Sequence, residues 1–191
     1  MGGVVTCLRT QACYMNGMHH PSATAKPIQR RITLLRHADA VADERGDDHA
    51  RVLSAAGQAS AQALGEWLRD NHMPAGLVLC STATRTRQTL DALGMNQPCM
   101  LVAPLYLASA GEMLAQLQQM DDAVSHIMLV GHNPGMHGLA ALLVKDYVRD
   151  ADADALAQGF PTAGLVSMTA DLAQWSGLSP HSATLDLLRF S

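Results

Sequence analysis

The sequence predicts a three-layer α/β sandwich in which helices cover both faces of one mostly parallel sheet. Short apolar runs alternate with amphipathic segments through residues 31–145, which is the pattern of repeated strand–helix–strand units. A chain of 191 residues also suits a single domain with one core. The last two apolar runs have no helical pattern between them, so we expect those strands to pair antiparallel at one edge of the sheet.

Residues 1–30 lack this periodicity, and we expect them to form a disordered arm before a domain over residues 31–191. Residues 1–31 hold four basic side chains and no acidic one, which leaves 9 basic and 17 acidic residues in the remainder. An acidic domain is not typical of a nucleic-acid-binding protein. No stretch reaches the roughly 18 apolar residues of a membrane helix, so no membrane association is expected.

The first strand is predicted over residues 31–36, a short apolar run. Ser54 is a suitable N-cap for the helix that follows, and Pro74 is expected to end that helix. The second strand is predicted over residues 77–80, and Ser81 then caps a helix over residues 82–93.

A short third strand is predicted over residues 100–102. Ser109 and Glu112 have the spacing of a capping box, which predicts a helix beginning there. The fourth strand is predicted over residues 127–130, where four apolar residues adjoin.

The chain after the fourth strand is less regular. Asn133 and Pro134 suit the N-cap and first position of a helix. Residues 145–162 are polar and predict a solvated loop or a frayed helix. The two closing strands are predicted over residues 165–169 and 184–189.

Basic and polar side chains directly follow three of the predicted strands. They are Arg36 and His37 after the first strand, Ser81 and Arg85 after the second, and His132 and Asn133 after the fourth. Each signal alone is weak, since an Arg-His pair is more often a surface feature and a Gly-His a turn. Because carboxyl ends of parallel strands meet at one edge, we expect the two histidines and the two arginines to converge there.

Such a set of side chains suits phosphoryl transfer. Two guanidinium groups can clamp a phosphoryl group, and one neutral imidazole can attack phosphorus while the other stabilises developing charge. The helix starts after Ser81 and Asn133 would add backbone donors to a bound substrate. No carboxylate cluster with ligand spacing accompanies these residues, so we expect neither a metal nor another cofactor.

Four segments carry a family resemblance. They are LLRHADA (34–40), VLSAAGQASA (52–61), CSTATRTRQTL (80–90) and LVGHNPG (129–135). In this order the segments resemble those of the histidine phosphatase superfamily, which includes the phosphoglycerate mutases. The chain is most similar there to the small SixA-type phosphohistidine phosphatases, which implies the phosphoglycerate mutase-like fold without a large lid insertion.

The resemblance implies roles for individual residues. His37 would be the nucleophile that becomes phosphorylated, with Arg36, Arg85 and His132 completing the phosphate pocket. Arg51 would contact phosphate or substrate near the mouth. Two residues depart from the family pattern, since Ala38 stands where glycine is usual and Thr82 where proline is usual.

The general acid is a third departure. Many relatives place a glutamate after the third strand, whereas Tyr106 or Leu107 stands near that position here. Asp48 is then the remaining candidate acid, and Asp39 is a less favoured one. Loss of the glutamate favours a leaving group that can depart protonated, such as an imidazole with a pKa of about 6.5.

We therefore expect a metal-independent phosphatase that hydrolyses protein phosphohistidine through a covalent intermediate on His37. A small-molecule phosphomonoesterase of the same superfamily remains the alternative, and a non-catalytic phosphoprotein-binding module is less favoured. The expected partner is a phosphohistidine-bearing signalling or phosphotransfer protein, and the expected state is a monomer. Four scattered cysteines without a CxxC pair favour reduced thiols and a cytoplasmic location.

Overall fold

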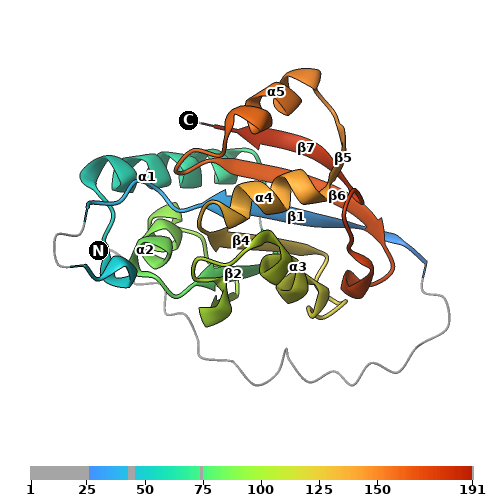
Figure 1. The fold of residues 1–191 in the computed structure, drawn as a ribbon, viewed down its shortest axis with the longest axis horizontal. Coiled ribbons are helices and arrows are strands. Elements are labelled where there is room, and N and C mark those ends of the chain that lie inside the picture. The colour runs from blue at the N-terminus through green and yellow to red at the C-terminus, as the bar shows by residue number, and fades with distance from the viewer. Residues whose placement is uncertain (1–25, 43–45, 74, 191) are drawn as a thin grey trace.

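The computed structural model describes residues 26–42, 46–73 and 75–190. In these residues seven strands form one sheet with the order β3-β2-β4-β1-β6-β7-β5 (Figure 1). The strands are β1 (Ile28–Arg36), β2 (Leu77–Ser81), β3 (Cys99–Val102), β4 (His126–Gly131), β5 (Val144–Tyr147), β6 (Leu165–Leu172) and β7 (Ala183–Arg189).

The strand directions confirm the predicted fold class. Strands β3, β2, β4 and β1 are parallel neighbours, as expected for strands joined by crossover helices. Strand β6 runs antiparallel to both β1 and β7, so the closing strands pair antiparallel as predicted. Strand β5 lies beyond β7 and is parallel to it.

Helices cover both faces of the sheet and complete the three predicted layers (Figure 1). The helices are α1 (Ala55–Asp70), α2 (Thr84–Leu93), α3 (Ala110–Gln118), α4 (Gly135–Leu143) and α5 (Asp150–Gln158). Leu64 of α1 and Leu90 of α2 share one buried cluster with Leu35 of β1. Apolar residues of α3, α4 and α5 share the other cluster with Ile32 and Leu34. Alternate β1 side chains therefore face opposite helical layers.

Three local predictions were wrong or incomplete. The polar segment after α4 contains strand β5 as well as helix α5, because Val144 and Leu156 are buried and anchor it to the sheet. Asn133 does not cap α4, whose N-cap is Pro134, since the Asn133 side chain donates to the Phe160 carbonyl instead. Ser81 does not cap α2, whose N-cap is Ala83.

The first strand begins at Ile28, three residues before the predicted start. Arg30 therefore belongs to the sheet, where its side chain is buried. The rest of the expected arm, residues 1–25, lies outside the described residues. The Ser54 cap on α1 and the capping box of Ser109 and Glu112 on α3 are confirmed.

Candidate active site

A cavity of about 290 Å³ opens at the carboxyl ends of β1, β2 and β4. Eleven residues line it: Arg36, His37, Asp39, Ala40, Asp48, Arg51, Arg85, Leu107, His132, Asn133 and Thr162. Because β6 runs antiparallel to β1, the segment that precedes it, including Thr162, also reaches this edge of the sheet. The site lies where open α/β sheets usually bind ligands.

His37 follows the last residue of β1 and has a defined tautomer. Its Nδ1 lies 2.7 Å from the Ala38 carbonyl oxygen. Because a carbonyl oxygen can only accept a hydrogen bond, Nδ1 carries the hydrogen. Nε2 is left with a lone pair and accepts a bond from Arg85 Nε at 3.2 Å. Burial lowers the pKa of His37 to about 4, and the charges of Arg85 and Arg36 add to the effect. Neutral His37 therefore has an unprotonated Nε2, whose lone pair accepts the bond from Arg85.

Ala38, which stands where glycine is usual, is accommodated in the packed interior. It is fully buried and belongs to a small apolar cluster with Ala61 and Ala163. Its backbone N–H donates to Thr89 Oγ1 of α2 at 3.0 Å. The segment after His37 is thus fixed against both α1 and α2.

His132 lies beside His37, with ring centroids 5.3 Å apart. Its Nε2 is 2.8 Å from Ser81 Oγ, and its Nδ1 accepts from Arg85 Nη2 at 3.2 Å. Burial and the nearby Arg85 lower the pKa of His132 to about 3. A serine hydroxyl can donate or accept, so Ser81 can support either tautomer of His132.

Arg85 is the central cation of the site and is almost fully buried. Besides both imidazoles, it binds the Asp48 carboxylate, with Nη2 2.9 Å from Oδ2. Its Nη1 donates to the backbone carbonyl of Asp48. One guanidinium thus holds both histidines and the Asp48 segment in a fixed arrangement.

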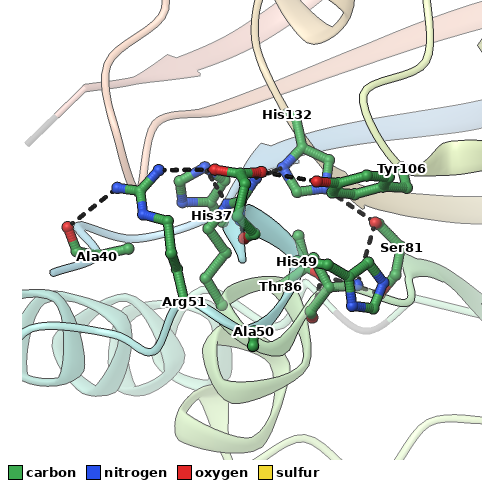
Figure 2. A network of polar contacts seen from close by, with 12 residues as sticks. His37, Ala40, His49, Ala50, Arg51, Ser81, Thr86, Tyr106 and His132 are labelled. Carbon is green, nitrogen blue, oxygen red and sulfur yellow. Dashed lines mark hydrogen bonds and ion pairs between the residues drawn. The ribbon is translucent and has the colours of Figure 1, made fainter. Parts of the chain in front are cut away.

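The Asp48 carboxylate is an acceptor for three side chains (Figure 2). Arg51 Nη1 donates to Oδ1 at 3.0 Å, and the Tyr106 hydroxyl donates to Oδ2 at 2.8 Å. Figure 2 shows Arg51 on one side of the site and Tyr106 on the other, with the His37 ring between them. The bond from Tyr106, with those from Arg51 and Arg85, lowers the pKa of Asp48 well below its ordinary value.

This network bears on the expected general acid. A carboxyl group with a strongly lowered pKa holds no proton near neutral pH, so Asp48 is poorly suited to that role in this arrangement. Tyr106 is no better placed, because its proton is directed at Asp48 and that carboxylate raises the pKa of the phenol. Leu107, the other residue near the expected position, has no proton to give.

Arg36 forms another wall of the cavity. Its Nη1 donates to the Phe160 carbonyl at 2.8 Å, and Asn133 Nδ2 donates to the same carbonyl at 2.8 Å. Burial lowers the pKa of Arg36 from its ordinary value. Among the described residues, the buried atoms Arg36 Nε and Asn133 Oδ1 have no hydrogen-bond partner.

The structure brings seven of the eight predicted site residues onto the cavity wall. The exception is Ser81, which is fully buried and does not line the cavity. Its hydroxyl contacts Nε2 of His132. The sequence reasoning gave no role to His49, whose ring packs edge-on against Tyr106, or to Thr162 and Phe160. Thr162 and Phe160 precede β6, whose antiparallel direction brings them to the cavity, and no sequence motif marks either residue.

No group of three or more His, Cys, Asp or Glu side chains in the described residues is placed to hold a metal ion. No helix in the same residues is both long enough and apolar enough to cross a membrane.

Comparisons with known proteins agree with this geometry. A family model described as histidine phosphatase superfamily (branch 1) matches residues 32–105. The uncharacterised protein Rv1276c of Mycobacterium tuberculosis is 34% identical over 152 residues, which cover 79% of this chain and 96% of that protein.

Solved structures share the fold. A Nakamurella multipartitia protein, provisionally named phosphohistidine phosphatase SixA, has 31% identity and a TM-score of 0.75, covering 86% of this chain and 98% of that one. A mycobacterial glucosyl-3-phosphoglycerate phosphatase has 18% identity and a TM-score of 0.55, covering 84% of this chain and 98% of that one. The second likeness concerns the fold alone.

Proposed function

Since the chain belongs to the histidine phosphatase superfamily, which indicates a phosphatase, we propose that it hydrolyses protein phosphohistidine without a metal ion. The observation that carries the choice of substrate is the state of the acidic groups at the cavity. Asp48 accepts three side-chain hydrogen bonds, and Asp39 accepts one from the Ser54 hydroxyl at 2.6 Å. The Asp48 carboxylate, which these bonds hold deprotonated, is poorly suited to protonate a leaving group.

A phosphohistidine substrate removes the need for that proton. In the first step, Nε2 of neutral His37 attacks phosphorus and the bond from phosphorus to the substrate nitrogen breaks. If the substrate ring is protonated at its other nitrogen, it departs as neutral imidazole, and the positive charge passes to phosphorylated His37. The Ala38 carbonyl, which accepts the Nδ1 hydrogen at 2.7 Å, stabilises that charge.

In the second step, water attacks phosphorus and the bond to His37 Nε2 breaks, which returns neutral His37 and inorganic phosphate. Arg36 and Arg85 bind the phosphoryl oxygens in both steps. In the tautomer that carries its hydrogen on Nδ1, His132 donates from Nδ1 to one of these oxygens. The Ser81 hydroxyl, 2.8 Å from Nε2, then becomes the donor to that nitrogen.

The experiment compares three phosphate donors with the purified protein in excess EDTA. They are a histidine-phosphotransfer domain phosphorylated with phosphoramidate, p-nitrophenyl phosphate and an alkyl phosphate. We expect kcat/KM to be highest on the phosphoprotein and lowest on the alkyl ester, because an alkoxide cannot leave without a proton. Faster turnover of the alkyl ester would instead favour the small-molecule alternative, and activity restored only by added metal would contradict metal independence.

A further inference from the structure

Apolar side chains are exposed around the mouth of the cavity. Of the five large apolar residues that the described part of the chain exposes, three lie there. Leu107 is 55% exposed, Val41 is 43% exposed and Val52 is 42% exposed. A cavity lined largely by arginine, histidine and aspartate is thus bordered by side chains that cannot bind phosphate.

The three residues are placed by direct contacts with the site. Leu107 itself lines the cavity. Val41 and Val52 each follow a lining residue, Ala40 and Arg51 respectively, and are joined because Val41 N donates to the Val52 carbonyl at 3.0 Å. The Arg51 guanidinium also donates to the Val41 carbonyl, at 2.9 Å. The backbones of the two valines therefore adjoin residues that line the cavity, while their exposed side chains are not part of its lining.

Leu107 is held exposed in an unfavourable backbone conformation. Its φ of +51° is in the left-handed region, which is costly for a residue other than glycine, asparagine or aspartate. The backbone next to Leu107 is tightly packed, because the Ala108 carbonyl lies directly against Gly135. A Cβ at Gly135 would be only 1.9 Å from that carbonyl oxygen. Strained residues tend to occur where a ligand is bound, and exposure of a leucine adds a second cost.

We propose that Leu107, Val41 and Val52 form an apolar rim that docks the apolar surface surrounding the phosphohistidine of a protein substrate. This inference rests on the proposed function and narrows its substrate class. A phosphorylated side chain in the cavity can contact Leu107, which lines it. Val41 and Val52 lie outside the cavity, so only a substrate larger than that side chain reaches them. A sugar or nucleoside phosphate would place hydroxyl groups against these methyl groups, whereas a protein surface can bury them.

The test measures kcat/KM on the phosphorylated phosphotransfer domain and on phosphoimidazole, and compares the ratio of the two. Leu107→Asn suits the left-handed backbone, and Val52→Thr keeps the side-chain shape, so both variants should fold with unchanged melting temperatures. We expect the ratio to fall about 10-fold for each, on the scale of one or two methylene groups no longer buried. Val148→Thr is the matched control, because Val148 is 64% exposed and is not a cavity residue.

The two donors distinguish failure of the apolar rim from failure of the proposed function. Equal losses on both donors, or no change in the ratio, would overturn the rim. If the wild-type protein hydrolyses phosphoimidazole but not the phosphoprotein, the proposed function fails whatever the variants do. Leu107→Gly provides a second check, since it relieves the positive φ and should lower the ratio while the melting temperature is maintained or raised.

Discussion

Strand β1 carries an arginine near each end, buried at Arg30 and half-buried at Arg36, and the two differ in how they are bonded. Arg30 is 1% exposed and donates to four backbone carbonyls, with an ion pair to Asp122 and the Trp175 ring beneath its guanidinium. The four carbonyls belong to Asp122, Val124, Leu172 and Ala173. Arg36, six residues later on the same face, has a buried Nε with no partner among the described residues.

The comparison separates a structural arginine from a binding one. Each guanidinium nitrogen of Arg30 donates to a backbone oxygen, and the Asp122 carboxylate pairs with its charge, so Arg30 holds β1 to the segment before β4 and to the end of β6. At the other end, Arg36 keeps an unused donor and Arg85 binds a carboxylate that is 44% exposed. Incomplete or displaceable bonding of a buried cation is what an anion site requires.

The largest expected effect is on the chemistry at the carboxyl end. His37→Ala removes Nε2, which we propose as the nucleophile, and should lower kcat by about 10⁴-fold or more. The phosphoenzyme should also disappear when labelled protein is denatured in alkali, which preserves phosphohistidine. A variant that still labels would show that another residue is the nucleophile.

The two arginines of β1 offer a matched pair of substitutions. Arg36→Lys keeps the charge but loses the planar fork, so kcat/KM should fall by about 10²–10³-fold with little change in melting temperature. Arg30→Lys leaves buried carbonyls without donors and should lower the free energy of unfolding by about 2–4 kcal/mol. Its kcat/KM should match that of the wild-type protein.

Kinetics and urea unfolding of both variants measure this contrast. If Arg30→Lys lost activity while folded, or if Arg36→Lys lost stability alone, the division between the two ends would be wrong. A fall in both quantities for both variants would mean that β1 acts as one unit.

The sequence predicted the carboxyl end better than the amino end. His37, Arg85 and His132 were placed together because strand ends converge, which depends only on strand adjacency. Arg30 was assigned to the arm, since its partners are backbone carbonyls up to 143 residues away and leave no side-chain pattern. The same limit applies to Tyr106 and Asp48, whose hydrogen bond joins two loops 58 residues apart.

A smaller effect is expected at Asp48, which binds the guanidinium groups that a phosphoryl group needs. Asp48→Asn removes the negative charge, so inorganic phosphate and tungstate should bind about 10-fold more tightly, on the scale of one charged hydrogen bond. Tyr106→Phe leaves the carboxylate in place and should change that affinity far less. Calorimetric titration with tungstate measures both.

Turnover measurements test the alternative that Asp48 is the general acid. If the residue donates a proton, Asp48→Asn should slow hydrolysis of an alkyl phosphate far more than that of p-nitrophenyl phosphate or phosphohistidine. We expect similar losses on all three donors, because the carboxylate in this structure is an acceptor. A selective loss on the alkyl ester would restore Asp48 as the acid.

The smallest expected effect is a slope of stability with pH. The pKa of His37 is about 4 and that of His132 about 3, whereas both are near 6.5 in the unfolded chain. Between pH 6 and pH 4.5 the unfolded state therefore binds more protons, and the free energy of unfolding falls as the pH falls. Each histidine contributes up to about 1.4 kcal/mol per pH unit. His132→Asn should make the slope shallower by about that amount. Urea unfolding of this variant and of the wild-type protein at pH 6, 5.5, 5 and 4.5 gives the two slopes. Equal slopes for His132→Asn and the wild-type protein would show that His132 is not held neutral at the carboxyl end of the strands.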